Sequence, residues 1–334
     1  MNLTTPIGAV TLANPLVTAS GCGGTGRELA PYTDLSRLGA FTTATVMARP
    51  RAGRPTPRIA ETPSGLLNAM GLPGPGLEAF LARELPWLAA QDVPTVVSVG
   101  GNTVQEFAEI ATRLAAAPAF RVAAGGTGAV AGVEVNVACP NAEDRGRMFA
   151  AAPAAAAEVV RAVRGAIHRD IPVLAKLSPD VTDIATIALA CADAGATGLS
   201  LINTVSGLAI DPATLRPALS GVSGGLSGPA VRPVALRCVF QVHAAIPDLP
   251  IVGGGGIATG SDALEFLVAG ATAFSVGTTL LHDPSAPQRI LRELEEALAA
   301  RGVARPADAV GMAHRPASPP RIAPPPRPRI EELT

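Results

Sequence analysis

The chain has 334 residues, of which 48% are hydrophobic and 16% are charged, so it is long enough to bury one large core. Its formal net charge is −1 and its 26 lysine and arginine residues are scattered, which argues against a nucleic-acid or membrane-surface partner. No apolar run reaches about 18 residues, and the first ten residues lack a signal-peptide pattern. The four cysteines form no CxxC pair, so we expect no metal site and no disulfide framework. These features predict a soluble cytoplasmic enzyme or binding protein.

One unit repeats along the chain: a short apolar strand, a polar or glycine-rich loop and an amphipathic helix. The predicted strands are Pro15–Ala19, Ala40–Thr45, Thr95–Val99, Val133–Val137, Val173–Leu177, Gly198–Ile202, Pro250–Gly253 and Ala273–Val276. The predicted helices are Glu78–Ala90, Val104–Ala116, Ala154–His168, Asp183–Ala194, Arg232–Ala245, Asp262–Ala269 and Pro287–Ala300. Eight strands alternating with helices over roughly 300 residues is typical of a (β/α)8 TIM barrel, an α/β fold. The alternative is an open parallel sheet, whose GxGxxG signature does not match the loop Ser20–Gly26, SGCGGTG.

The end of the chain differs in composition from the rest. After Gly311 the sequence is rich in proline, with Pro324–Pro326 as its densest run, and it offers little to bury in a core. We therefore predict a single barrel domain over residues 1–312 and a disordered Pro-rich tail over residues 313–334.

The stretch Val133–Asn141, VEVNVACPN, carries the clearest chemical signal. Apolar and polar residues alternate as in a buried strand, and Pro140 ends the pattern. The strand end thus presents the carboxamides of Asn136 and Asn141 and the thiol of Cys139. Carboxamides suit a planar, amide-like ligand, and a thiol can transfer a proton. The same pattern also fits a structural asparagine and a buried apolar cysteine.

Three further strand ends suggest a bound anion, because barrel enzymes hold their ligands at the carboxyl ends of the strands. The glycine-rich ends Val252–Ile257, VGGGGI, and Val276–Thr279, VGTT, come from the last two strands, where such barrels commonly bind phosphate through backbone N–H groups. Lys176 ends another apolar strand, where a lysine is costly unless it meets an anion. A lysine that extends to solvent is the alternative.

From about Leu3 to Val310 the chain resembles the class 1 dihydroorotate dehydrogenases, the soluble FMN enzymes of pyrimidine biosynthesis. The resemblance rests on Asn14–Gly21, Pro55–Gly76, the NVACPN motif, Ala175–Ile184, Leu201–Thr204, Gly224–Arg237 and VGTT. The stretch Gly224–Arg237, GGLSGPAVRPVALR, is closest to the branch whose catalytic subunit pairs with a subunit that carries FAD and an iron–sulfur cluster. This chain lacks cluster ligands, so the resemblance implies a separate electron-transfer subunit, within a homodimer or a heterotetramer.

The resemblance also implies residue roles. The residues implied to hold FMN are Ser20, Thr45, Asn102, Asn136, Lys176, Ile202, Gly228, Gly255, Gly256, Gly277 and Thr278, with Ala44 at a cofactor-contacting position. Those implied to bind the pyrimidine are Asn68, Met70, Gly71, Leu72, Asn136, Asn141, Asn203 and Thr204. Cys139 and Lys176 are the implied catalytic pair. Cys139 would take a proton from C5 while a hydride leaves C6 for the flavin, and Lys176 would lie at the N1/O2 edge of the flavin. A free cysteine titrates near pH ~8.5, so we expect flavin reduction to speed up toward that pH.

One position departs from the family pattern. The family places at the end of the second strand a lysine that contacts both the flavin and the substrate carboxylate, whereas this chain has Ala44. No basic residue follows in this segment before Arg49. The departure leaves three hypotheses open: oxidation of dihydroorotate to orotate, the same chemistry on a dihydropyrimidine without a carboxylate, and a flavin-binding paralogue without turnover.

Overall fold

The computed structural model describes residues 1–120, 130–139 and 147–316, and its centre is a parallel sheet of eight strands. The order is β3 (Leu16–Thr18), β16 (Ala273–Val276), β15 (Ile251–Gly254), β10 (Gly198–Leu201), β9 (Val173–Leu177), β8 (Val130–Asn136), β7 (Thr95–Val99) and β4 (Phe41–Thr42). A parallel bridge between Val17 and Ala40 joins β3 to β4 and closes the sheet. The predicted (β/α)8 barrel is confirmed, and the open sheet is wrong.

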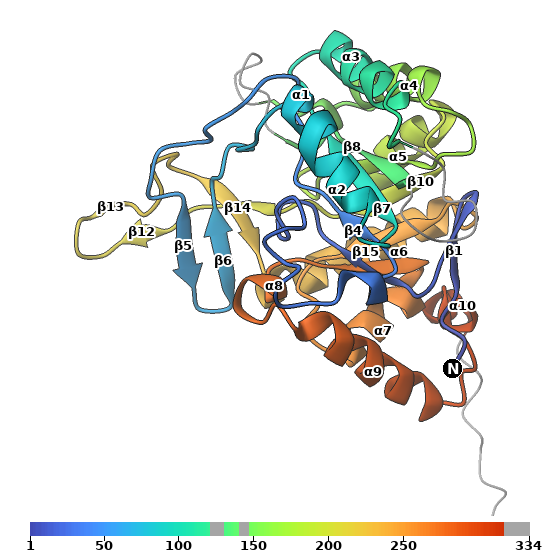
Figure 1. Cartoon of the computed structure of the whole chain (residues 1–334). Coiled ribbons are helices and arrows are strands. Elements are labelled where there is room, and N and C mark those ends of the chain that lie inside the picture. The colour runs from blue at the N-terminus through green and yellow to red at the C-terminus, as the bar shows by residue number, and fades with distance from the viewer. Residues whose placement is uncertain (121–129, 140–146, 317–334) are drawn as a thin grey trace, which may run out of the picture.

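Helices follow the strands and cover the outside of the barrel (Figure 1). They are α1 (Leu77–Ala79), α2 (Leu85–Ala89), α3 (Val104–Ala115), α4 (Pro153–Ala166), α5 (Ile184–Asp193), α6 (Arg232–Ala245), α7 (Gly260–Ala269), α8 (Thr279–His282), α9 (Ala286–Ala299) and α10 (Pro306–Ala309). The side chains of Thr103, Asp183 and Thr259 accept backbone N–H bonds at the starts of α3, α5 and α7, which fixes where these helices begin. Within the described ranges, no helix is both long and apolar enough to cross a membrane.

Proline explains the irregular helix between β6 and β7. A π-helical turn, Phe80–Glu84, joins α1 to α2. It ends just before Pro86, which has no N–H to donate to the preceding turn, so the helix widens there.

The barrel has two apolar regions. The larger lies between strands and helices and includes Val133 and Val135, the outward-facing residues of β8. The smaller lies inside the barrel and includes Ile7 and Leu12 from an N-terminal hairpin, β1 (Thr5–Ile7) and β2 (Val10–Leu12). This hairpin was not predicted. Because Glu134 and Asn136 alternate with the outward-facing valines, their side chains face the barrel interior.

A second, antiparallel sheet lies beside the barrel and projects away from it (Figure 1). Its strands, in spatial order, are β11 (Val205–Gly207), β14 (Gly224–Ser227), β6 (Gly65–Asn68) and β5 (Ile59–Thr62). A hairpin of β12 (Ile210–Asp211) and β13 (Arg216–Pro217) extends from it. These strands come from the excursions after β4 and β10, so the sheet starts at the carboxyl ends of barrel strands.

Several predicted boundaries differ from the structure, and β8 begins at Val130 rather than at Val133. The second strand was predicted over Ala40–Thr45, but β4 is shorter because the N–H of Ala44 donates to the carbonyl of Gly24 rather than to β7. Past residue 312, His314 stacks on the ring of Phe240. Residues 317–334, most of the predicted tail, lie outside the described residues.

Candidate active site

Two neighbouring strands bring the predicted catalytic residues together. Asn136, the last residue of β8, is the register partner of Lys176 on β9, so both side chains stand at the same level of the barrel. Cys139 comes after β8 and the two residues Val137 and Ala138, at the mouth of the barrel. Asn141 lies outside the described residues.

Lys176 is buried inside the barrel, with only 6% of its surface exposed. Its Nζ donates a hydrogen bond to Ser20 Oγ at 2.8 Å and lies 3.6 Å from Glu134 Oε2. The solvent-exposed alternative for this lysine is therefore wrong. Lys176 is also the only lysine among the 26 basic residues of the chain, the others being arginine. A compact ammonium group is kept at this one position, where the planar fork of an arginine is a poor replacement.

A line of hydrogen bonds runs inside the barrel from Glu134 to Asn136. Ser98 Oγ donates to Glu134 Oε1 at 2.8 Å, and the hydroxyl oxygens of Ser98 and Thr45 are 3.0 Å apart. Asn136 Nδ2 donates to Thr45 Oγ1 at 3.0 Å. The other amide atom, Asn136 Oδ1, is buried without a hydrogen-bond partner among the described residues. A buried acceptor of this kind is normally paired, so this oxygen points to a ligand.

Cys139 lies in an environment that opposes its ionisation. Burial raises the pKa of the Cys139 thiol to about 11, and the ammonium of Lys176 offsets part of that rise. Hydrogen bonds from Asn136 and Asn203 also lower the pKa, whereas the carboxylate of Glu134 raises it. The titration near pH 8.5 expected from the sequence is therefore wrong for this thiol.

Three glycines after β14 and β15 form a cradle that is lined by backbone rather than by their side chains. Gly228, Gly255 and Gly256 have φ angles of +89°, +141° and +79°, in the range that favours glycine. A Cβ atom on Gly256 would lie 2.7 Å from the carbonyl oxygen of Gly228, and one on Gly255 would lie 2.7 Å from the Cβ of Ala235. The close approach leaves backbone rather than side chains at this edge, as a phosphate site requires.

The end of β16 completes this edge. Thr278 Oγ1 donates to Ser227 Oγ at 2.8 Å, which joins β16 to β14. A Cβ on Gly277 would lie 3.2 Å from the Cβ of Ala19, at the end of β3. The predicted cofactor residues of the last two strands thus meet those of the first strand.

The predicted pyrimidine residues lie where the second sheet meets the barrel. Asn68 Nδ2 donates to the carbonyl of Gly225 at 3.1 Å, and a Cβ on Gly225 would overlap the side chain of Thr204. Asn203 Nδ2 donates to the carbonyl of Ala138, next to Cys139, at 3.1 Å. These contacts place Asn203 beside Cys139, and they bring Asn68 and Thr204 together at Gly225.

The loop that follows β6 reaches the barrel mouth. Leu72 has a φ of +52° and lies 3.9 Å from the position of a Cβ on Gly100, directly after β7. Gly71 has a φ of +75°, and the carbonyl of Met70 accepts a hydrogen bond from the N–H of Arg54 at 3.0 Å. The predicted segment Asn68–Leu72 therefore spans from the second sheet to the end of a barrel strand.

Two more predicted cofactor residues occupy strand ends. The backbone N–H of Asn102 donates to Glu106 Oε2 at 2.6 Å, and that of Ile202 donates to the carbonyl of Gly254 at 3.1 Å. Asn102 follows β7, and Ile202 follows β10. Both are thus held at the carboxyl end of the barrel.

Ala44 is half-buried at the end of β4, and Arg49, the next basic residue, is exposed. The buried ammonium group of Lys176 lies on the other side of the pocket. A carboxylated ligand thus finds no cation at position 44.

Two participating residues, Glu134 and Ser98, were missed in the sequence. Both face the barrel interior, and a signal was present, because Glu134 stands two residues before Asn136 and so shares its face of the strand. In the part of the chain that the structure describes, no group of three His, Cys, Asp or Glu residues could hold a metal ion.

Comparison with known proteins identifies relatives over almost the whole chain. The family model for dihydroorotate dehydrogenase matches residues 2–298. A protein from Desulforudis audaxviator, named dihydroorotate dehydrogenase B (NAD(+)), catalytic subunit, is 51% identical over 309 residues, covering 92% of this chain and 96% of its own. A protein of the same name from Pelobacter propionicus is 48% identical over 310 residues, covering 93% and 98%.

A solved structure agrees with the fold. The crystal structure of DHODH from Eimeria tenella, in complex with ferulenol, superposes with a TM-score of 0.78 at 22% identity and covers 94% of this chain and 89% of that one. At this identity the similarity concerns the fold alone.

Proposed function

We propose that this chain, which belongs to the dihydroorotate dehydrogenase family, is the catalytic subunit of an NAD(+)-linked dihydroorotate dehydrogenase. It oxidises dihydroorotate to orotate in de novo pyrimidine biosynthesis and uses FMN. The observation that carries the residue assignments is the only lysine of the chain, which is buried near a thiol and near an amide oxygen that has no partner among the described residues.

The described residues fit FMN on three separate grounds. Among the described residues, Asn136 Oδ1 is a buried acceptor without a partner, and the N–H groups of the flavin and of the pyrimidine both supply donors. Lys176 supplies a cation where a reduced flavin gains negative charge. The cradle of Gly228, Gly255 and Gly256 suits the phosphate. The remaining residues proposed to contact FMN are Ser20, Ala44, Thr45, Asn102, Ile202, Gly277 and Thr278.

FMN supplies the hydride acceptor when it is bound. The proton is handled by the protein: we assign Cys139 as the base that removes it from C5 of the substrate. The hydrogen bonds from Asn136 and Asn203 favour the thiolate that this step requires. Lys176 contributes the positive charge of its ammonium group.

The pyrimidine would lie between the mouth of the barrel and the second sheet. Its alternating N–H and C=O groups match the amides and hydroxyl of Asn68, Asn203 and Thr204. Of these, Asn203 donates to the carbonyl of Ala138, next to Cys139. Backbone groups of Met70, Gly71 and Leu72 complete the proposed site, together with Asn141.

The absence of lysine at position 44 favours one alternative, a dihydropyrimidine without a carboxylate. The relatives that match over almost the whole chain carry the name of the dihydroorotate enzyme, which favours dihydroorotate. If the substrate is dihydroorotate, this protein binds its carboxylate without a charged side chain at position 44.

The names of the relatives also bear on partners and location. A protein named as a catalytic subunit implies a second subunit, and we propose a separate electron-transfer subunit that carries electrons to NAD(+). Because NAD(+) is an intracellular acceptor, we propose a cytoplasmic location.

Anaerobic mixing tests the proposed function. Protein loaded with FMN is mixed with dihydroorotate, and in a parallel run with dihydrouracil, while flavin absorbance and orotate formation are followed. We expect dihydroorotate to bleach the flavin with one orotate formed per flavin, and dihydrouracil to act much more slowly. Failure to take up FMN, or faster bleaching by dihydrouracil, would contradict the assignment.

A further inference from the structure

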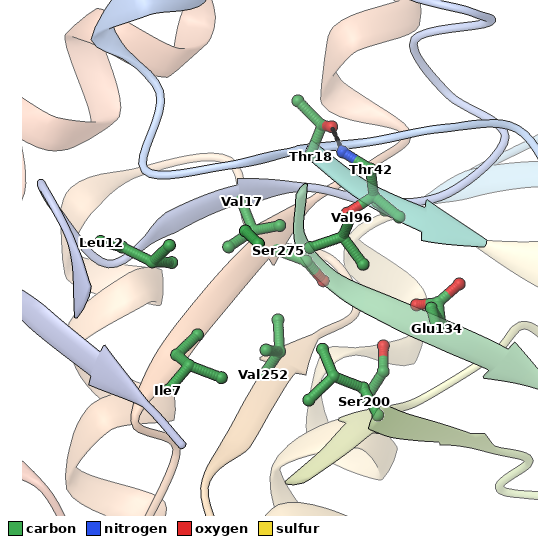
Figure 2. Close-up of a pocket in the computed structure, with 13 residues that line it drawn as sticks. Ile7, Leu12, Val17, Thr18, Thr42, Val96, Glu134, Ser200, Val252 and Ser275 are labelled. Atoms are coloured by element: carbon green, nitrogen blue, oxygen red, sulfur yellow. Dashed lines mark hydrogen bonds between the residues drawn. The ribbon is translucent and has the colours of Figure 1, made fainter. Parts of the chain in front are cut away.

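Glu134 is a carboxylate buried inside the barrel, only 3% exposed, and none of the roles above uses it. A buried carboxylate is costly unless it is paired and hydrogen-bonded. It lines a cavity of about 20 Å³, which has room for one water. Figure 2 shows Ile7 and Leu12 on one side of this cavity and Glu134 on the other. The other lining residues are apolar or neutral, so the cavity offers Glu134 no second counter-ion.

The charged partner of Glu134 among the described residues is Lys176. Oε2 lies 3.6 Å from Nζ, and both side chains are at least nine-tenths buried. On the far side, Nζ donates to Ser20 at 2.8 Å. The ammonium is thus held between two oxygens, and the carboxylate reduces the positive charge that Lys176 presents to the cofactor.

The other carboxylate oxygen determines the direction of a hydrogen-bond chain. Ser98 uses its one hydroxyl proton on Glu134 Oε1, so the Thr45 hydroxyl must donate to Ser98. Thr45 therefore accepts from its other neighbour, and Asn136 can meet it only with Nδ2. That choice turns Asn136 Oδ1 toward the ligand side, where it has no hydrogen-bond partner in the part of the chain that the structure describes.

We propose that Glu134 is a positioning residue that sets the polarity of the cofactor pocket. Through one carboxylate oxygen it holds the Lys176 ammonium in place and partly offsets its positive charge. Through the other, by way of Ser98 and Thr45, it makes Asn136 present an acceptor rather than a donor. The inference rests on the proposed function, because it takes FMN and the pyrimidine as the ligands of Lys176 and Asn136.

The contact of Glu134 with Lys176 and its contact with Ser98 lead to different predictions for Glu134→Gln. Loss of the negative charge leaves the Lys176 ammonium unopposed, and a cation favours the reduced flavin. The equilibrium constant for FMN reduction should rise at least about tenfold, a positive shift of about 30 mV for a two-electron couple. The glutamine amide can also donate to Ser98 and reverse the chain, so Asn136 loses its fixed orientation and orotate binding should weaken.

Ser98→Ala tests the hydrogen-bond chain to Asn136 separately from the contact between Glu134 and Lys176. It breaks the chain to Asn136 but leaves the Glu134–Lys176 pair in place. Orotate affinity should fall about three- to tenfold, the loss of one hydrogen bond, while the midpoint potential changes by less than a third of the Glu134→Gln shift.

The experiment compares wild type, Glu134→Gln and Ser98→Ala, each loaded with FMN. Spectroelectrochemistry gives the midpoint potential, and titration gives the FMN and orotate dissociation constants. Lysine labelled with ¹³C at Cε adds a readout that needs no turnover, because the single lysine gives a single resonance. This resonance should move in Glu134→Gln and stay in place in Ser98→Ala.

The outcomes separate this inference from the proposed function. Wild-type protein that takes up no FMN would overturn both. Wild type that binds FMN, with an unchanged or lower potential in Glu134→Gln, would overturn the inference and leave the function standing. If Glu134→Gln does not fold, Ser98→Ala provides the test. Weaker orotate binding at an unchanged midpoint potential would support the proposal that the hydrogen bonds through Ser98 and Thr45 orient Asn136. Unchanged orotate binding would refute it.

Discussion

Cys139 allows a quantitative test of the proposed proton transfer. Burial raises the pKa of its thiol to about 11, so the thiol stays protonated well above neutral pH. At pH 8 the thiolate fraction is then about one in a thousand, against about one in four for a free cysteine of pKa ~8.5. If the thiolate takes the C5 proton, flavin reduction should accelerate about tenfold per pH unit from pH 7 to pH 10, without a plateau near 8.5.

Anaerobic stopped-flow mixing of FMN-loaded protein with saturating dihydroorotate measures this dependence. Cys139→Ala should slow reduction at least ~100-fold, the lower end for general base catalysis, and should remove the slope. The FMN dissociation constant is the control and should stay within about twofold of wild type, since the thiol is not assigned to the cofactor. A plateau below pH 9 would refute the effect of burial on the pKa. Unchanged kinetics in Cys139→Ala would refute the assignment of the base.

Three further substitutions test the pocket. Lys176→Met should make the midpoint potential of bound FMN more negative in spectroelectrochemistry, because the cation that favours reduction is lost; a more positive potential would contradict this. Gly256→Ala should weaken FMN binding at least about tenfold, because its Cβ would lie 2.7 Å from the carbonyl oxygen of Gly228. Gly302→Ala is the matched control, since Gly302 also has a positive φ, +68°, but nothing within 4 Å of its Cβ position, and it should leave FMN binding unchanged. Ala44→Lys should tighten orotate by roughly tenfold or more and uracil by much less in a binding titration, and equal gains would argue against a charge-assisted contact.

The barrel could be predicted because its strands are uniform. Thr95–Val99, Val173–Leu177 and Ala273–Val276 have the same bounds in the sequence prediction and in the structure. Each is an apolar run bounded by loops, and burial on both faces leaves little ambiguity. Helix ends were predicted to within about two residues, since polar caps mark several of them.

The second sheet could not be predicted for an equally physical reason. Its strands are half-exposed, and β14, GGLS, begins with two glycines that have low strand propensity. Gly225 is needed because the side chain of Thr204 occupies the space where a Cβ would be. Long-range packing, rather than local pattern, therefore determines this sheet.

The site shows the same division between local and long-range information. Lys176 and Cys139 could be singled out because a lysine and a thiol at apolar strand ends are conspicuous. The pairing of Lys176 with Glu134 could not be predicted, because the two residues belong to different strands and the register between β8 and β9 is invisible in one sequence. The raised pKa of Cys139 is likewise a property of burial, which only the fold reveals.

The basic residues of the chain show which charge the pocket requires. Of its 26 basic residues only Lys176 is lysine, so this composition favours arginine wherever a surface cation suffices. Inside the barrel, Ser20 and Glu134 meet one nitrogen from opposite sides, a geometry that fits an ammonium and not a planar guanidinium. At position 44, where the family pattern has lysine, the chain has alanine. The chain thus has a buried cation at Lys176 and none at position 44, and we expect Ala44→Lys to add affinity for orotate through a new charge-assisted contact.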